Sequence, residues 1–314
     1  MVDITFLGTG GGMPMPFRHL SSFIINYKGR KMLFDCGEGC QIWMREYSIG
    51  FKSIDIILIS HAHGDHINGL PGLLATIGNS GREEELTIIG PVGITKVIEG
   101  LMVTARHIPY NINIIECNNS NLNFKIQNKI IVPCDERNSE INIVTLILDH
   151  STECIGMKLE IKRSAKFDRE LAEKNNVPKI LWSRLQKGEE VEFEEKIYKS
   201  DLVLGESRKG IIISYITDSR PIDEIINFIK ESDLFICEGT YGDDKDLDKA
   251  IKNKHMTFRE GAILGKEANV KELIFTHYSP ALLKPEEFID NAKKIFKDSF
   301  LAYDGMKKTL NFLD

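Results

Sequence analysis

Short hydrophobic runs, many of them rich in isoleucine, valine and phenylalanine, recur along the chain between segments that contain glycine, proline, asparagine and aspartate. Runs of four to eight such residues, bounded by turn formers, predict β-strands. We expect strands at residues 4–7, 23–27, 31–34, 54–59, 86–89, 142–148, 155–161, 211–217, 234–237 and 273–275. The polar stretch "NNSNLN" at residues 118–123 is typical of a surface loop.

Helical patterns lie between these strands. In residues 285–297, hydrophobic residues recur at the spacing of one helix face, after Pro285 and two acidic residues and before three lysines. The segment "NGLPGLLATIG" after residue 66 predicts another helix. Because early strands lie in adjacent pairs with helices around them, we expect an α/β fold with stacked sheets, outer helices, and two halves that meet near residues 150–205.

The composition is that of a globular protein without membrane spans. Hydrophobic residues make up 42% and charged residues 27% of the 314 residues. No apolar run approaches the roughly 20 residues that cross a bilayer. The first residues lack the basic and apolar regions of a secretory signal. The six cysteines form no C-x-x-C pair, which suits reduced thiols. We therefore expect a cytoplasmic protein with no membrane partner.

The net charge of −6 argues against a nucleic-acid partner, but the charge is unevenly distributed. Residues 162–187 contain eight Lys or Arg against three acidic residues, which gives this segment a net charge of +5. The acidic stretch "GEEVEFEE" follows at once. Because charge runs usually face water, charge alone indicates that residues 162–200 form a solvated, polar excursion from the compact body.

The glycine cluster "GTGGGMP" at residues 8–14 invites a nucleotide-binding interpretation. It follows a strand but continues into Met13 and Pro14 rather than into a helix, and it lacks the Gly-Lys-Ser/Thr ending of a phosphate loop. Both nucleotide motifs therefore fail, and we expect no nucleotide cofactor. The cluster instead predicts a tight loop whose backbone approaches another part of the chain closely.

The stretch "SHAHGDH" at residues 60–66 concentrates three histidines and one aspartate at a predicted strand-to-helix turn. His61 and His63, two residues apart, can point to one side of an extended segment, while Asp65 and His66 lie beyond the bend. Imidazole and carboxylate groups suit zinc and related divalent ions, and they would be costly to bury unpaired. The stretch therefore predicts a metal site, and one turn can serve two metal positions.

Three polar residues later in the chain directly follow predicted strands: His150, Asp218 and His277. Because all three directly follow strands, we expect their loops to meet residues 60–66 in one shared site at the end of a rigid sheet. Asp35 also ends a strand, and it could orient a ligand histidine from behind. Histidines without such a context are interpreted as structural or surface residues: His19 and His107.

At this point the sequence resembles a known family. The motifs "FLGTGGG", "LFDCGEGCQ", "SHAHGDHINGLPGLL", "IIGPVG", "TDSRP" and "FTHYSP" occur in this order over residues 5–280. They are similar to the ordered motifs of the ribonuclease Z family within the metallo-β-lactamase superfamily. The resemblance implies an αββα sandwich of two mixed sheets flanked by helices. It also implies a single domain over residues 1–314, with a flexible arm inserted at residues 162–200.

The resemblance implies two Zn²⁺ ions per subunit, with Mn²⁺ or another divalent ion as the alternative. Position by position, one zinc would be held by His61, His63 and His150, the other by Asp65, His66 and His277, and both by a bridging Asp218. Asp65 would also accept the proton of the attacking water. The altered motifs "CEGT" and "HMT" retain Glu238 and His255. The family links these two catalytic residues to proton delivery near the leaving group; the alternative is a structural hydrogen bond.

The implied activity is that of a zinc-dependent endoribonuclease. It would remove the 3′ trailer from precursor tRNA by phosphodiester hydrolysis and leave a 3′-hydroxyl on the tRNA. The arm would clamp the tRNA through its phosphates, although the family's Gly-Pro is here Lys179-Ile180. A homodimer is also implied. The alternatives are another hydrolase of the superfamily, such as an arylsulfatase or a small-molecule phosphodiesterase, and a non-catalytic RNA-binding protein. The basic arm argues against the first, and the complete ligand set argues against the second.

Overall fold

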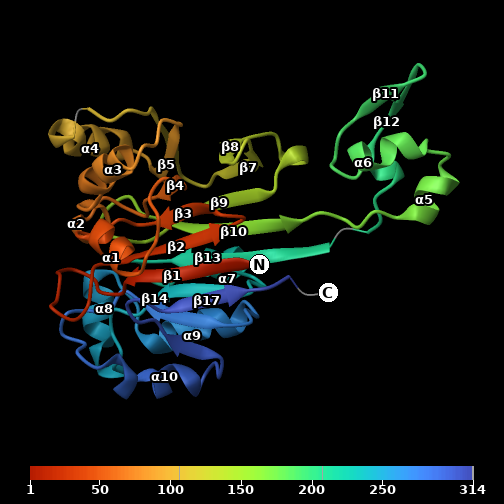
Figure 1. The fold of residues 1–314 in the computed structure, drawn as a ribbon. Helices are drawn as coiled ribbons and strands as arrows, with labels where there is room; N and C mark the ends of the chain where they lie inside the picture. The colour runs from red at the N-terminus through yellow and green to blue at the C-terminus, as the bar shows by residue number, and fades with distance from the viewer. Residues whose placement is uncertain (106, 207, 313–314) are drawn as a thin grey trace.

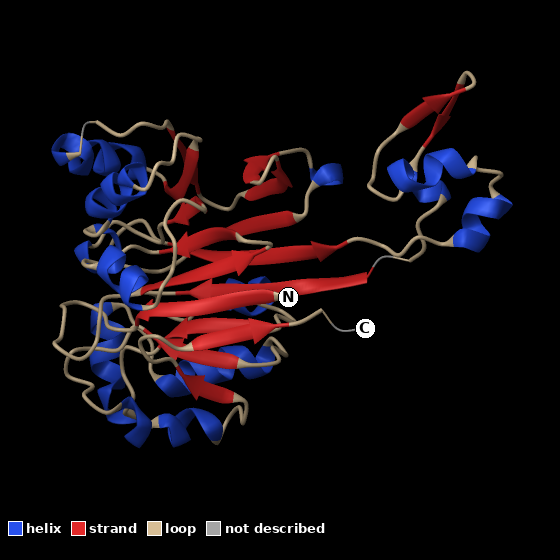
Figure 2. Ribbon diagram, viewed as in Figure 1, coloured by secondary structure: helices blue, strands red, loops and turns tan. Residues whose placement is uncertain are grey.

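A computed structural model describes residues 1–105, 107–206 and 208–312. Within this part of the chain, two large mixed sheets lie face to face and helices cover their outer sides (Figures 1 and 2). The expected α/β sandwich is therefore confirmed. One hydrophobic cluster, which includes Phe6, Phe34, Met157 and Ile213, draws its buried residues from both sheets. Removing such side chains from water is the main favourable term in folding.

The first sheet has the strand order β17-β1-β2-β3-β4-β5-β6. Its strands are β1 (Val2–Gly8), β2 (Ser22–Tyr27), β3 (Arg30–Phe34), β4 (Ile54–Leu58), β5 (Leu86–Pro91), β6 (Ile112–Cys117) and β17 (Lys307–Leu310). β1 pairs antiparallel with β2 on one side and with β17 on the other. Every residue of β4 is buried, as expected for a central parallel strand that is covered on both faces.

The second sheet has the strand order β16-β15-β14-β13-β10-β9-β7-β8. Its strands are β7 (Asn121–Gln127), β8 (Ile130–Pro133), β9 (Ile141–Ile147), β10 (Ile155–Arg163), β13 (Arg208–Ile216), β14 (Leu234–Glu238), β15 (Leu273–Thr276) and β16 (Ser299–Leu301). The change from one sheet to the other thus falls between Cys117 and Asn121. The expected boundary near residues 150–205 is wrong, because β7 to β10 pair with the later strands and β17 returns to the first sheet.

Two helical layers cover the outer faces. Over the first sheet lie α1 (Cys40–Glu46), α2 (Gly64–Ile67), α3 (Leu70–Asn79), α4 (Ile94–Leu101) and η1 (Met102–Thr104). With the second sheet are η2 (Glu136–Asn138), α7 (Asp223–Phe228), η5 (Asp244–Asp246), α8 (Leu247–Asn253), α9 (Phe258–Glu267), η6 (Pro285–Glu287) and α10 (Ile289–Lys293). No helix in the described ranges is both long and apolar enough to cross a membrane.

Two local expectations are corrected. The helix predicted over residues 285–297 is instead η6 followed by the short α10, because Phe288 between them has φ −115°, where it packs against Gly242. The loop predicted at residues 118–123 already enters β7. There the Asn142 side-chain amide donates to the side-chain oxygens of Asn121 and Asn123, so polar residues hold this strand pair together.

The arm is a small folded lobe that stands away from the sandwich (Figure 1). It contains α5 (Arg169–Lys174), η3 (Lys179–Leu181), α6 (Trp182–Leu185), β11 (Val191–Phe193), β12 (Lys196–Tyr198) and η4 (Ser200–Leu202). Its hydrophobic core is its own, with buried residues that include Leu181, Leu185 and Tyr198. Lys162 and Arg163, the first residues of the predicted excursion, belong to β10. The lobe closes where Phe167 and Leu204 form a bridge.

Candidate metal centre

The loop that follows β4 brings the histidine stretch to the end of the first sheet. The buried β4 ends at Leu58, and His61 then pairs with Cys154 across the gap between the two sheets. His63 precedes the short helix α2, which carries Asp65 and His66. The same end of the second sheet receives His150 after β9, Asp218 after β13 and His277 after β15. The structure therefore brings together all seven residues that the sequence proposes as metal ligands.

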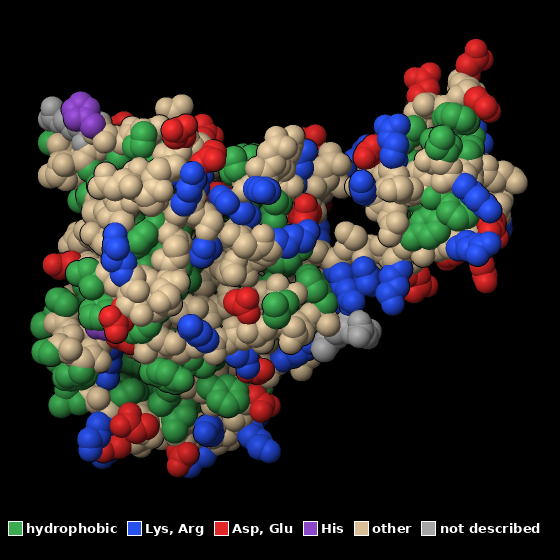
Figure 3. All heavy atoms as spheres, in the orientation of Figure 1, with side chains coloured by type: hydrophobic (Ala, Val, Ile, Leu, Met, Phe, Trp, Pro, Cys, Tyr) green, Lys and Arg blue, Asp and Glu red, His purple; other side chains and the backbone are tan. Residues whose placement is uncertain are grey.

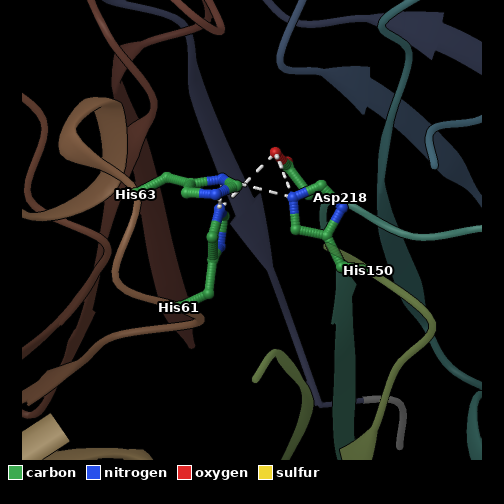
Figure 4. Close-up of side chains that lie close together, drawn as sticks. All are labelled: His61, His63, His150 and Asp218. Atoms are coloured by element: carbon green, nitrogen blue, oxygen red, sulfur yellow. Dashed lines mark hydrogen bonds and ion pairs between the residues drawn. The ribbon is translucent and has the colours of Figure 1, made fainter. Parts of the chain in front are cut away.

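One group of ligand atoms consists of three ring nitrogens and one carboxylate oxygen (Figure 4). His63 Nδ1 lies 3.0 Å from His61 Nε2 and 3.2 Å from His150 Nε2. Asp218 Oδ2 lies 3.6 Å from His61 Nε2 and 3.8 Å from His150 Nε2. In Figure 4 the side chains come from opposite sides and point toward one another.

A second group lies on the other side of the same aspartate. His66 Nε2 and His277 Nε2 are 3.0 Å apart, and Asp65 Oδ2 lies 3.5 Å and 3.3 Å from them, respectively. The other oxygen of Asp218, Oδ1, lies 3.6 Å from His66 Nε2 and 3.2 Å from His277 Nε2. Asp218 thus turns one carboxylate oxygen toward each group, which is the geometry of a bridging ligand.

These separations fit metal ions. Two ligand atoms about 2.0–2.1 Å from a tetrahedral zinc ion are about 3.3 Å apart, close to the distances within each group. Neutral ring nitrogens that face each other as acceptors would repel, whereas a cation between them is attracted to each. The donor set of imidazoles and carboxylates is also the one that zinc and related ions prefer. The residues of both groups therefore fit divalent metal ions.

The ring nitrogens that face away from the centre have partners that orient the rings. These pairs are His61 Nδ1 with Ser60 Oγ at 3.0 Å, His66 Nδ1 with Asp35 Oδ2 at 2.8 Å, His150 Nδ1 with the Lys254 carbonyl at 3.1 Å, and His277 Nδ1 with Thr240 Oγ1 at 3.1 Å. Such partners set the tautomer and direction of a metal-binding histidine. They leave the inner nitrogens free to bind an ion.

Asp35 orients a histidine, as the sequence analysis proposed. Its carboxylate is fully buried, contacts His66, and accepts hydrogen bonds from the Ser60 N–H, the Ser60 hydroxyl and the Tyr215 hydroxyl at 2.7–2.9 Å. Asp35 has φ +54°, a left-handed conformation that aspartate tolerates better than most residues. Sequence reasoning missed Ser60, Thr240 and Tyr215, whose contacts to the centre depend on the tertiary fold.

The glycine loop makes the predicted close approach. A Cβ atom at Gly11 would lie 2.3 Å from the His277 ring, so only glycine leaves room for this ligand. The Gly12 N–H, at φ +76°, donates to Asp65 Oδ2 at 2.6 Å. The loop therefore packs against one metal group with its bare backbone.

Charges within the site control the ionisation of its carboxylates. Burial alone would raise the pKa of Asp218, but the neighbouring His277 and His66 hold it well below its usual range. The pKa of Asp65 is likewise lowered, because hydrogen bonds to His277 and His66 outweigh burial. Burial lowers the pKa of His61 and of His150, which favours the neutral, metal-binding form of both rings.

Glu238 and His255 lie beside the two groups. His255 Nδ1 is 3.2 Å from Glu238 Oε1 and 4.0 Å from Asp218 Oδ2. Glu238 is fully buried and accepts hydrogen bonds from the Ser219 N–H and the Thr240 hydroxyl. Burial alone would lower the pKa of His255, but the Glu238 carboxylate outweighs it and raises this pKa to about 9. His255 is therefore protonated at neutral pH.

The two histidines without a predicted role lie outside both ligand groups. His19 stacks on Trp43 and pairs with Asp304 at 2.8 Å, and His107 is exposed. These positions suit the structural or surface roles that the sequence indicates, and the absence of a catalytic role for them stays a prediction.

The chain is similar to known proteins in both sequence and fold. A family model described as "Anti-Pycsar protein Apyc1" matches residues 2–105. Ribonuclease Z of Clostridium perfringens is 56% identical, over 99% of this chain and 99% of that protein. Human tRNase Z, short form, superposes with a TM-score of 0.68 at 24% identity, covering 98% of this chain and 99% of the other. The metallo-β-lactamase fold protein YhfI from Bacillus subtilis gives 0.69 at 19%, covering 98% and 100%.

The two solved structures share the fold, which is therefore the metallo-β-lactamase fold. The alignment with Ribonuclease Z covers 99% of both chains, so it spans the arm as well as the sandwich. The chain belongs to the ribonuclease Z family.

Proposed function

We propose that the protein is an endoribonuclease that removes the 3′ trailer from precursor tRNA by phosphodiester hydrolysis and leaves a 3′-hydroxyl on the tRNA. The observation that carries this proposal is the paired ligand site around Asp218, in a chain that matches Ribonuclease Z over its full length. A metal pair suits phosphodiester hydrolysis, because both the attacking and the leaving oxygen need charge stabilisation.

Each subunit would hold two zinc ions, or Mn²⁺ or another divalent ion in their place. The ligands would be His61, His63 and His150 for one ion, Asp65, His66 and His277 for the other, and Asp218 for both. When bound, such ions lower the pKa of water and stabilise charge on phosphate oxygens. Asp65 would accept the proton of the attacking water, because its ionised carboxylate belongs to the second ligand group.

Glu238 and His255 would act at the leaving group. Cleavage that leaves a 3′-hydroxyl requires a proton on the departing 3′-oxygen of the tRNA. His255, whose pKa is raised to about 9, carries that proton at neutral pH, and Glu238 holds the ring in position. General acid catalysis of this kind is typically worth about 10²- to 10⁴-fold in rate.

The arm would bind the body of the tRNA. Exposed lysines within residues 162–200 include Lys166, Lys174, Lys179 and Lys187. Among the described residues, none of the four has a carboxylate within ion-pair distance, so their charges are available to phosphates. Such contacts are sensitive to salt and to RNA shape rather than to base sequence. A small substrate has no need of a separate basic lobe, which argues against a small-molecule hydrolase.

A homodimer would place this arm near a metal centre. β10 begins beside the proposed ligands and β13 ends beside them. Each strand is nine residues long, or roughly 30 Å. The arm leaves from the opposite end of these strands, away from the centre (Figure 1). This direction supports an arrangement in which the arm of one subunit presents the tRNA to the site of the other.

The test is cleavage of a trailer-bearing precursor tRNA by the purified protein, with both product ends mapped. The expected products are tRNA with a 3′-hydroxyl, cut just beyond the acceptor stem, and a trailer with a 5′-phosphate. Failure to cut there, together with rapid hydrolysis of a small phosphodiester or sulfate ester, would favour the alternative hydrolase.

A further inference from the structure

A cavity of about 530 Å³ opens next to the metal centre, between the loops that follow β14 and β15. Its lining includes Thr240, Tyr241, Ser279, Leu282, Leu283 and Phe288. The volume lies in the range of pockets that enclose small organic groups. Neither the ligand groups nor the Glu238–His255 pair occupies it.

The cavity begins one residue away from the catalytic groups. Thr240 Oγ1 lies 3.1 Å from His277 Nδ1, and the adjoining Tyr241 ring lies 6.4 Å, centre to centre, from the His255 ring. The Ser279 N–H donates to the Thr240 carbonyl and joins the two loops at the mouth. An RNA nucleotide whose phosphate is at the metal centre can therefore place its base in this cavity.

The lining suits a base better than a phosphate. Leucine, tyrosine and phenylalanine side chains form much of the wall, and aromatic and aliphatic surfaces of this kind stack on unpaired bases. The two lysines at the rim are neutralised locally: Lys249 pairs with Asp246 at 2.6 Å and Lys284 with Glu287 at 3.1 Å. A phosphate site would leave such lysines unpaired.

The wall is held in place before any ligand arrives. The buried Arg18 guanidinium donates to the carbonyls of Leu282 at 2.9 Å and Leu283 at 3.1 Å. On the other side, the Asn291 side chain donates to the Gly242 carbonyl at 2.9 Å, and Asn253 donates to the Tyr241 hydroxyl at 2.7 Å. A preformed wall reduces the entropy that binding would otherwise cost.

We propose that this cavity binds the base of the last tRNA nucleotide, the one immediately 5′ of the scissile phosphate. The inference rests on the proposed function, in which His255 protonates the 3′-oxygen of that nucleotide. Because Tyr241 lies beside His255, the sugar that carries the leaving oxygen is at the cavity mouth. The base is then unstacked from the acceptor stem and lies against Tyr241 and Leu283.

The test is a double-mutant cycle. One change is a substitution in the protein, and the other removes the base from the substrate. Precursor tRNA that is abasic at this nucleotide should be cut by the natural protein with kcat/KM lowered about tenfold, because base stacking of this kind is worth about 1–3 kcal/mol. Leu283→Ala and Tyr241→Ala should lower kcat/KM similarly on the intact precursor. On the abasic precursor, either substitution should lower kcat/KM little further, because the base that Tyr241 and Leu283 would contact is absent.

Leu247→Ala is the matched control, because Leu247 is an exposed leucine on the adjoining α8 and does not line the cavity. Its effect should be less than twofold on either precursor. Thermal unfolding and metal content verify that each variant is folded and loaded. If the loss from the substitution and the loss from the missing base simply multiply, the side chain and the base act independently and the proposal is overturned. Coupling to an abasic first trailer nucleotide instead would also overturn it. Absence of cleavage by the natural protein would contradict the proposed function itself.

Discussion

The proposed metal centre draws on residues that lie up to 216 positions apart in the sequence, from His61 to His277, whereas the hydrophobic core of the arm comes from residues 167–204 alone. Around the proposed metal centre most inner groups are buried, and His66, His150 and His277 are each oriented by a hydrogen bond from another segment. On the arm, the charged side chains are exposed and several are paired only with near neighbours, as Arg169 is with Glu173 and Arg184 with Glu189.

This difference separates two tasks. A hydrolytic site needs reacting groups placed within tenths of an ångström, so it is built where tertiary packing removes freedom. Binding to a phosphate backbone needs charge in the right region but not at an exact atom, so a lobe with flexible lysines suffices. Changes at the centre should therefore affect every substrate, and changes on the arm only the large one.

The largest effect is expected from Asp65→Ala, which removes a proposed metal ligand, the proposed proton acceptor and the partner of the Gly12 N–H. We expect kcat/KM to fall about 10⁴-fold for precursor tRNA and for a small phosphodiester alike. Single-turnover cleavage and metal analysis measure this loss. Asp135→Ala, at an exposed loop position, is the control and should remain active. Near-normal activity of Asp65→Ala would disprove the mechanism.

Removal of the arm should separate the two tasks. The Gly205 N–H bonds to the Lys166 carbonyl at 2.9 Å, so residues 167–204 can be deleted and the ends joined with little strain. A shorter deletion, of residues 164–188, is less suitable. It would remove Leu181 and Leu185 but keep Tyr198, and so would expose the remaining half of the arm's hydrophobic core. We expect kcat/KM to fall about 10²- to 10³-fold for precursor tRNA. Hydrolysis of a small phosphodiester should change less than threefold; loss of both activities would mean that the arm supports the fold.

Glu238→Gln tests the proton donor. In the metal-free protein, NMR titration should show the pKa of His255 falling from about 9 toward the ordinary 6.5, because the carboxylate that raises it is gone. The raised pKa stabilises the fold fully below pH 6.5, and this contribution is lost as pH rises through 9. Glu238→Gln should remove that pH dependence and slow cleavage about 10- to 100-fold. An unchanged titration would show that another group controls His255.

The smallest effect is expected from the arm lysines. Changing four of them to glutamine should weaken tRNA binding about tenfold and reduce the salt dependence of binding: Lys166, Lys174, Lys179 and Lys187. The matched control changes four glutamates of the β11–β12 hairpin segment to glutamine: Glu189, Glu192, Glu194 and Glu195. The β11–β12 hairpin lies at the far end of the arm, where Figure 3 shows acidic side chains. Negative charge there repels phosphates, so the control should bind tRNA at least as well. Equal weakening in both variants would disprove a charge-specific contact.

The parts of the fold that sequence could predict are those with local signals. Each predicted strand is present, because short hydrophobic runs between turn formers are a local signal that sequence carries. The convergence of His150, Asp218 and His277 followed from one rule, that polar residues just after parallel strands meet at one edge. The sheet boundary at residues 117–121 could not be predicted, because it depends on which distant strand pairs with β7.

The arm shows the same limit at a smaller scale. The strands β11 and β12 are three residues long, and the turn between them uses Glu194 and Glu195 at φ 51° and 61°. Hairpin turns whose residues have positive φ usually contain glycine or asparagine. With two glutamates in the turn, no local signal marks the hairpin. The residues that hydrogen-bond to the proposed ligands, such as Thr240 with His277, could not be predicted either, because only the folded chain brings them together.

The pairing of β1 with β17 constrains how the protein is made. During synthesis, residues 2–8 emerge about 300 residues before their partner at 307–310, so one edge of β1 stays open until that partner has also been made. Open strand edges recruit other chains. His277, which packs against Gly11 of the adjoining loop, also arrives late. A nascent chain therefore cannot assemble the second ligand group until residue 277 has left the ribosome, more than 200 residues after Asp65 and His66.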